Sequence, residues 1–264
     1  MTKTGHNFFH VLPQHQALVR EVGIDAQSVF DDPRIVVWRG LSDRENCTLD
    51  APDADGVVVR LHVKRYTPVR SDPGPAQLEF DGLRLLENAG LPVAPLVGWG
   101  RLTDGRSFTI WRDLSGYTPG DKHVGAGQPF EPLLEPTADL AARLHDANLH
   151  HRDLYLCHFM VNGSNPTDLR LIDTARVGRM KCALTRRRWV VKDLSQFWYS
   201  TTRLPITGEQ RLRWLTCYAN RRGIKSVDRL RASVERKARW IGRHDARLEQ
   251  KQPNRNVSIP EKRL

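Results

Sequence analysis

The feature that most constrains the fold is a pair of aspartates that the sequence attaches to two separate rigid elements. A strongly helical segment, residues 138–145, leads into the run H-R-D-L at residues 151–154, which contains Asp153. The strand-like residues 169–172 then end directly at Asp173. The chain is therefore expected to fold so that a short loop after a helix and the end of a strand each present a carboxylate.

The composition is that of an ordinary globular protein. With 264 residues, 39% of them apolar, the chain can build one large domain or two lobes with a shared cleft. It has no run of about 18 apolar residues and no basic-then-apolar signal pattern at its N-terminus, so we expect a cytoplasmic location. Its 4 cysteines form no C-x-x-C pair, which indicates reduced thiols rather than disulfides or a structural zinc site.

The formal net charge of +11 is concentrated near the end of the chain, where residues 221–264 hold 14 basic and 5 acidic residues. Such a segment suits a polyanion, and charge alone does not choose among an anionic membrane surface, a phosphorylated glycolipid and nucleic acid. A solvated basic helix is the alternative. Residues 230–248, which include Trp240, have the pattern of a basic amphipathic helix that either lies on a membrane or packs on its own domain.

The hydrophobic pattern predicts an α+β fold. A helix is expected at residues 76–89, because leucines recur there at helical spacing before a glycine and a proline. Short β-branched runs predict antiparallel strands within residues 35–49, 57–66, 97–102 and 107–111.

Changes in composition divide the chain into four regions. Residues 115–136 are rich in glycine and proline, which is typical of a hinge and loop. Helical patterns dominate after this stretch. The four regions are a lead-in at residues 1–34, a β-rich lobe at 35–113, a helical lobe at 114–222 and a basic helical tail at 223–264.

A lysine and a glutamate are placed to act together. On the strand expected at residues 57–66, alternation puts apolar residues on one face and Lys64 on the other, where it can project into a cleft and bind phosphate. Glu79 begins the next helix and can reach back to pair with this lysine. Glu87, two turns further along, is the competing partner, and either charge could instead be a solvated surface residue.

The two aspartates complete a set of charges suited to phosphoryl transfer, a reaction that needs positioned charge more than covalent help from the protein. Asp153, in a loop after a helix, is suited to position an acceptor hydroxyl. Asp173, at the end of a strand, is suited to hold the metal ion that neutralises the phosphates. Four histidines crowd residues 145–158, but no cysteine or carboxylate completes a familiar zinc-ligand spacing, so we reject a zinc site.

Three motifs, H-R-D-L-Y-L-C-H-F-M-V, L-I-D-T-A-R and R-R-W-V-V-K-D-L, resemble the lipopolysaccharide core heptose and Kdo kinase family, relatives of the protein kinases. The resemblance covers about residues 35–215. It implies a bilobal protein-kinase-like fold with a small antiparallel β-rich N-lobe and a helical C-lobe. It also implies ATP and Mg²⁺ as cofactors and a sugar hydroxyl of the lipopolysaccharide inner core as acceptor.

The same resemblance implies partners and a location. The acceptor would be core lipopolysaccharide or another phosphorylated glycolipid, reached at the cytoplasmic face of the inner membrane. The basic tail would add contact with an anionic membrane surface, and no nucleic-acid partner is expected.

Site residues carry over position by position. Lys64 matches the ATP lysine and Glu79 its partner. Asp153 matches the catalytic aspartate and Asp173 the metal ligand. Asp193 matches the buried helix aspartate that braces the catalytic loop.

Other cofactor contacts follow less directly. A hinge near residues 111–116 would contact adenine through backbone groups, which adds Trp111 and Asp113 to the cofactor-binding set. His158 stands where protein kinases place a metal-binding asparagine. Because Mg²⁺ prefers oxygen ligands, His158 is expected to orient phosphate or Asp173 instead. The chain also lacks a G-x-G-x-x-G lid.

The segment after Asp173 bears on the acceptor. It is short and has no A-P-E segment of the kind that docks peptides in protein kinases, which favours a sugar or lipid acceptor. A protein or small-metabolite kinase on the same fold and a polyanion-binding pseudokinase remain the alternatives. The segment also carries cations suited to an acceptor that already bears phosphates, or to a solvated loop. These cations are Arg176, Arg179, Lys181, Arg186, Arg187 and Arg188.

Overall fold

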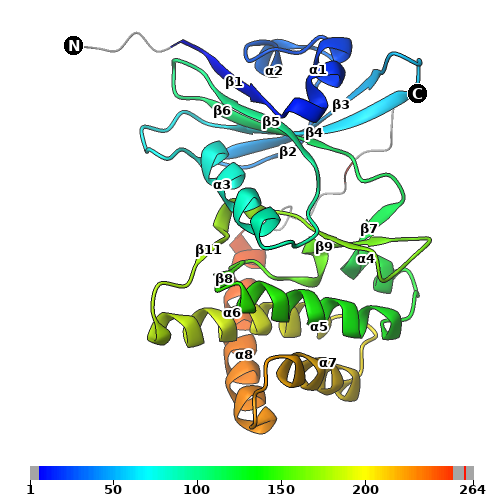
Figure 1. The fold of residues 1–264 in the computed structure, drawn as a ribbon, viewed down its shortest axis with the longest axis vertical. Helices are drawn as coiled ribbons and strands as arrows, with labels where there is room; N and C mark the ends of the chain where they lie inside the picture. Colours follow the sequence, from blue (N-terminus) through cyan, green and yellow to red (C-terminus); the bar gives the residue numbers. More distant parts are fainter. Residues whose placement is uncertain (1–5, 252–258, 260–264) are drawn as a thin grey trace. The chain divides into compact units, whose positions relative to one another are not determined.

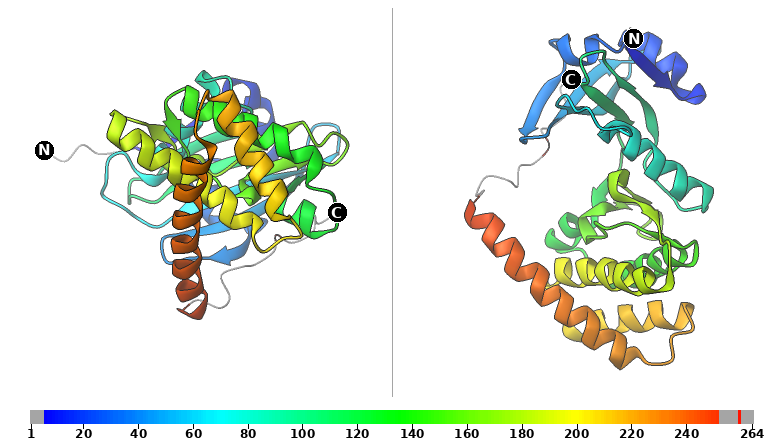
Figure 2. Two further views of the ribbon diagram at one scale, coloured as in Figure 1. Left: turned by 90° about the horizontal axis from the view of Figure 1, so that it is seen from below. Right: turned by 90° about the vertical axis from the view of Figure 1, so that its left-hand side faces the viewer.

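The computed structural model describes residues 6–251 and residue 259, and the chain divides into two compact units. Among the described residues, the first unit holds the chain up to Asp81 together with Ala94–Leu114, and the second holds Gly82–Val93 and the chain from Ser115 to Lys251. Figures 1 and 2 show the elements of each unit. One unit is built on an antiparallel sheet and the other mainly from helices, so the predicted α+β class with a β-rich N-terminal and a helical C-terminal lobe is confirmed.

The first unit is organised around a six-stranded sheet in which every neighbouring pair is antiparallel. The strand order is β1-β5-β6-β4-β3-β2. The four predicted strand regions all lie in this sheet, because their β-branched residues pack well on a pleated surface. The strands are β1 (Phe8–Val11), β2 (Val36–Gly40), β3 (Arg44–Pro52), β4 (Val58–Tyr66), β5 (Leu96–Arg101) and β6 (Ser107–Arg112).

The N-terminal segment does more than lead into the sheet. Its strand β1 pairs with β5 at the sheet edge, and it continues through η1 (Pro13–His15), α1 (Gln16–Val22) and α2 (Ser28–Asp31). Val22 and Val29 are buried in the same core as the strand residues. The sequence predicted only a lead-in here, because a four-residue strand and two short helices carry too little periodicity to be recognised.

The central strand β4 presents two different faces. Val59, Leu61 and Val63 are buried in the sheet core. Arg60, His62 and Lys64 alternate with them and therefore lie on the other face of the strand. Lys64 therefore stands on the face opposite the sheet core, as the alternation predicted.

Within the described residues, the second unit contains four long helices, a three-stranded sheet (β10-β9-β7) and a two-stranded sheet (β11-β8). In its core, the rings of Phe197 and Trp214 stack with their centroids 3.9 Å apart. The long helices are α5 (Glu131–Asp146), α6 (Ala183–Thr201), α7 (Gly208–Arg221) and α8 (Val227–Lys251). The remaining elements are α4 (Gly120–Gly125), β7 (Tyr117–Pro119), β8 (Leu149–His150), η2 (Leu156–His158), β9 (Phe159–Asn162), β10 (Leu169–Leu171), η3 (Thr174–Arg176) and β11 (Gly178–Arg179).

The glycine- and proline-rich stretch predicted as a loop is mostly ordered structure. It contains β7, α4 and the first turn of α5, which begins at Glu131. Pro132 lies at the start of α5, where its missing N–H has no helical partner to lose. Proline therefore marked a helix start here rather than a loop.

Helix α8 is packed on its own unit along one face. Val234, Ala238 and Ile241 are buried, and α8 crosses α6 as Figure 1 shows. The apolar stripe of the predicted amphipathic helix thus packs against the protein, while Trp240 stays 50% exposed. No helix within residues 6–251 is long and apolar enough to cross a membrane.

Candidate active site

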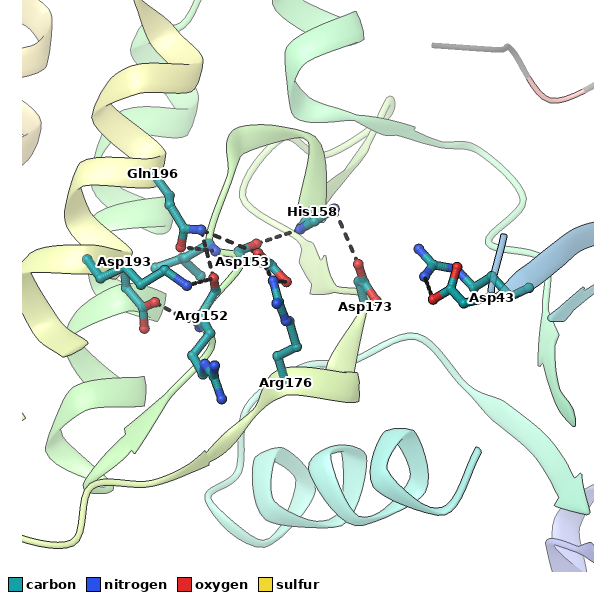
Figure 3. Close-up of polar contacts among 11 residues, drawn as sticks. Asp43, Arg152, Asp153, His158, Asp173, Arg176, Asp193 and Gln196 are labelled. Carbon is teal, nitrogen blue, oxygen red and sulfur yellow. Dashed lines mark hydrogen bonds and ion pairs between the residues drawn. The ribbon is translucent and has the colours of Figure 1, made fainter. Parts of the chain in front are cut away.

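Asp153 lies in the loop between β8 and η2, and a buried carboxylate on α6 fixes that loop. Asp193 is fully buried, and its oxygens accept hydrogen bonds from the backbone N–H groups of His151 (2.7 Å) and Arg152 (2.8 Å). Arg152 has a φ of +69°, a left-handed conformation that is costly for a residue with a side chain. The carboxylate of Asp193 stabilises this conformation, and Figure 3 shows the contact.

A second group of polar side chains on α6 holds the same loop. The Gln196 amide accepts a hydrogen bond from the N–H of Leu154 (3.2 Å) and donates to the carbonyl of Arg152 (2.7 Å). Lys192 Nζ donates to that same carbonyl at 2.7 Å. Lys192 and Gln196 were not predicted as site residues from the sequence. The sequence pattern that could have indicated them is the spacing of Lys192 and Gln196, which places both on the face of α6 that carries Asp193.

The Asp153 carboxylate has two side-chain donors. Gln196 Nε2 lies 3.3 Å from Oδ1, and the guanidinium of Arg176 lies 3.2 Å from Oδ2. The Asp153 side chain is 17% exposed and that of Arg176 is 56% exposed. The carboxylate is therefore oriented by α6 from one side and open to solvent on the other.

His158 connects the two aspartates that the sequence singled out. Its Nδ1 donates to the backbone carbonyl of Asp153 at 2.5 Å, and its Nε2 lies 3.8 Å from Oδ2 of Asp173 (Figure 3). Burial alone would lower the pKa of His158, but Cys157, the Asp173 carboxylate and the Asp153 carbonyl outweigh it and raise the pKa to about 10. With Nδ1 bonded to the Asp153 carbonyl and Nε2 facing the Asp173 carboxylate, His158 is placed to orient Asp173.

Asp173 follows β10 and starts the turn η3. Its φ of +61° places it in the left-handed region, and the next residue, Thr174, is fully buried. Gly82, on helix α3 (Pro75–Asn88), lies against this turn so closely that a Cβ there would be 2.0 Å from the Thr174 carbonyl oxygen. The backbone at Asp173 is thus held by close packing.

The donor set around Asp173 fits Mg²⁺ better than zinc. Within the described part of the chain, no group of three or more His, Cys, Asp or Glu side chains could hold a metal ion. Mg²⁺ is commonly bound by only one or two carboxylates, with substrate phosphates and water as its other ligands. A single accessible carboxylate at Asp173 is compatible with that arrangement.

In the first unit, Glu79 pairs with Lys64. The Glu79 carboxylate is fully buried and accepts hydrogen bonds from Lys64 Nζ, from Tyr66 Oη (2.6 Å) and from Thr109 Oγ1 (3.0 Å). Three donors offset the cost of burying this charge. The competing glutamate, Glu87, pairs instead with Arg84 at 2.9 Å. Tyr66 and Thr109 could not be selected from the sequence, because their role depends on where β4 and β6 lie beside α3.

Trp111 and Asp113, predicted near the adenine, are held by other groups of the first unit. Trp111 is buried and donates from Nε1 to Thr109 Oγ1 at 3.0 Å. Asp113 has its carboxylate 2.7 Å from Nε2 of His62, and its N–H donates to the Arg60 carbonyl at 3.0 Å. The N–H of Asp113 is thus already used, and the adenine contact of this segment stays a prediction.

A braced aspartate in a loop after a helix, a second aspartate at the end of a strand, and a strand lysine paired with a buried glutamate are the features of a kinase-like phosphotransferase. Residues 73–218, more than half of the chain, match the model of the lipopolysaccharide kinase (Kdo/WaaP) family. The chain belongs to this family and is a kinase. The predicted resemblance and the predicted function class, ATP-dependent phosphorylation in the lipopolysaccharide inner core, are confirmed.

Two curated relatives support the same assignment. The chain is 27% identical over 230 residues to the lipopolysaccharide core heptose(I) kinase WaaP of Pseudomonas aeruginosa. This alignment covers 76% of the chain and 84% of the relative. It is 23% identical over 180 residues to the enzyme of the same name from Escherichia coli K12. This alignment covers 62% of the chain and 67% of the relative.

Proposed function

We propose that the chain transfers the γ-phosphate of ATP to a hydroxyl of a heptose in the lipopolysaccharide inner core. The observation that carries this proposal is the linkage of Asp153 to Asp173 through His158, with the Asp153 loop fixed by Asp193. The heptose is suggested by the names of the two relatives.

Each site residue has a separate task in this reaction. Asp153 positions the acceptor hydroxyl and takes its proton as the new bond forms. Lys64 binds phosphate oxygens of ATP, and Glu79 orients its ammonium group. Asp173 holds Mg²⁺, which neutralises charge on the phosphates when it is bound. His158 keeps the Asp173 carboxylate in place.

The acceptor suggests where the enzyme works. A glycolipid acceptor is embedded in a membrane, so the catalytic site has to reach the membrane surface. We propose peripheral contact at the cytoplasmic face of the inner membrane, where ATP is present.

The test is transfer of radiolabelled γ-phosphate from ATP to core lipopolysaccharide whose heptoses lack phosphate. Asp153→Asn should lower kcat by about 10²- to 10⁴-fold, the usual contribution of general base catalysis. The same variant should keep the rise in melting temperature that Mg²⁺ and ATP produce. Asp173→Asn should lose both transfer and the Mg²⁺-dependent part of that rise.

Asp146→Asn, an exposed aspartate at the end of α5, is the matched control and should leave transfer unchanged. Label on protein instead of glycolipid would indicate a protein kinase. Loss of nucleotide binding in Asp153→Asn would show that its role is wrongly assigned.

A further inference from the structure

A strongly basic groove lies beside the catalytic loop in the second unit. It has a volume of about 870 Å³ and is lined by α6, α8 and Arg152. Among the lining residues that the structure describes there is no carboxylate. The cations of the groove are Arg152, Arg187, Arg188, Lys192, Arg236 and Lys237.

Helical spacing explains how these side chains meet. On α6, Arg188 and Lys192 are four residues apart, and on α8, Ser233, Lys237 and Trp240 follow at spacings of four and three. Residues at these intervals lie on one face of a helix. The face of α8 that carries them is distinct from the buried face at Val234, so the helix packs with one side and lines the groove with another.

The groove cations differ from other cations of the same unit. On α8 itself, Arg231 pairs with Glu235 at 2.8 Å, and Glu249 pairs with Arg203 at 2.7 Å. Within residues 6–251, by contrast, no ion pair with a carboxylate involves any of the six groove cations. Within the described residues, no carboxylate in contact therefore offsets the repulsion among these cations.

Arg188 on α6 and Lys237 on α8 line the groove from different helices. Burial lowers the pKa of Lys237, and the Arg188 guanidinium lowers it further. A fold that needed these charges only for solubility would gain stability by placing them apart. Their approach indicates a ligand that brings negative charge.

Two tryptophans order the cations before any ligand arrives. The guanidinium of Arg152 lies 4.7 Å and that of Arg188 5.0 Å from the centre of the Trp189 ring, and Lys237 Nζ lies 3.6 Å from that of Trp240. Cation–π contacts restrict flexible side chains without neutralising their charge. Less freedom is then lost when an anion binds, which favours affinity.

We propose that this groove binds the anionic groups, phosphate or carboxylate, of the glycolipid acceptor and so selects and positions it for phosphorylation. Arg152 lines the groove and precedes Asp153, so a sugar next to the bound anion can reach the catalytic carboxylate. Guanidinium groups are well suited to phosphate and carboxylate oxygens. This inference rests on the proposed function, because it takes the acceptor to be lipopolysaccharide.

The test compares two double variants of the full chain that remove the same charge from the same helix. Arg236→Ala with Lys237→Ala removes two groove cations, whereas Arg239→Ala with Arg243→Ala removes two exposed cations outside it. The groove variant should raise KM for core lipopolysaccharide about tenfold or more, the size expected from lost charge-assisted contacts, with kcat and KM for ATP unchanged. The control variant should behave as the native chain.

A second acceptor identifies the chemistry. On the same lipopolysaccharide with its remaining phosphates removed and its carboxylates reduced to alcohols, the groove variant and the native chain should have equal KM. Because removal of Lys237 relieves repulsion with Arg188, the groove variant should also melt no lower than the native chain. A lower melting temperature in the groove variant alone would indicate a structural role and would overturn the proposal.

Binding without ATP separates this proposal from the proposed function. Native and variant chains are titrated with micelles of core lipopolysaccharide and with phosphatidylglycerol vesicles. If the groove variant binds the glycolipid more weakly than the native chain but binds the vesicles equally well, the groove is a binding site for the glycolipid. This result would hold even if the native chain transfers no phosphate and the proposed function fails. If the groove variant binds the glycolipid as well as the native chain does, the proposal is overturned. If the groove variant loses the same affinity for the micelles and for the vesicles, the proposal is also overturned, and the groove makes general membrane contact instead.

Discussion

At the scale of single residues, the Asp153 loop is held by side chains that bond to backbone groups. Asp193 accepts from two consecutive N–H groups, and Gln196 both accepts from and donates to the residues on either side of Asp153. Such contacts fix the backbone whatever side chains the loop carries. They explain how Arg152 keeps a left-handed conformation next to Asp153.

Asp193→Asn should destabilise the protein, and the loss should depend on pH. An amide offers one acceptor oxygen where the carboxylate offers two, so one buried N–H loses its partner at a cost of about 1–3 kcal/mol. Burial raises the pKa of the Asp193 carboxyl, but hydrogen bonds from His145 and His151 outweigh it, and the pKa in the folded state is lowered. Its contribution to stability is therefore present above its unfolded pKa of about 3.9 and is lost as pH falls further.

Melting temperatures of the native chain and Asp193→Asn, measured between pH 7 and pH 3, test this prediction. The difference should be largest near neutrality and should narrow below about pH 4. Asp146→Asn, at an exposed position, should show only a small difference throughout. If the difference in melting temperature between the native chain and Asp193→Asn stays constant with pH, the charge of the Asp193 carboxylate contributes nothing to stability.

At the scale of elements, close packing of α3 fixes the turn after the strand β10. Helix interiors usually disfavour glycine, so Gly82 in the middle of α3 requires a reason. That reason is the carbonyl of Thr174, which lies where a side chain would be. Because Thr174 follows Asp173, the packing of this helix also positions the Asp173 carboxylate.

Gly82→Ala should therefore lower the melting temperature by several degrees, since the added Cβ forces α3 and the turn apart and overpacking of this kind costs about 1–3 kcal/mol. Gly208→Ala at the start of α7 is the matched control, because the nearest atom is 3.9 Å away on the flexible side chain of Arg211. That variant should melt at or slightly above the native temperature. Equal melting of both variants would show that α3 adjusts without cost.

The elements also show how far the sequence could be interpreted. The positions of Lys64 on one face of a strand and of Asp173 at the end of a strand were predictable, because strand alternation and the end of an apolar run are local patterns. Tyr66, Thr109 and Gln196 were not, because their roles come from bonds to residues far away in the sequence. The edge strand β1 was missed for the opposite reason, since four residues carry too little pattern.

At the scale of the whole molecule, α8 contributes both to the core of the second unit and to the excess positive charge. The sequence treats residues 223–264 as a basic tail, but one face of α8 is buried at Val234, Ala238 and Ile241. Tyr199 on α6 also donates to the Asp245 carboxylate at 2.7 Å. One helix thus completes the core of the second unit with one face and presents cations with another.

Ending the chain at Gly223 should consequently lower the stability of the second unit, and not only its net charge. Burial of a Val or Ile side chain contributes about 1.5–3 kcal/mol, so removal of α8 should lower the melting temperature by about 10 °C or more. The Arg239→Ala and Arg243→Ala double variant, which removes charge but no packing, should melt within about 2 °C of the native chain. Calorimetry of the three proteins at equal ionic strength measures both effects. If the shortened chain melts as the native chain does, α8 is a separable tail after all, and its buried face contributes little to the fold.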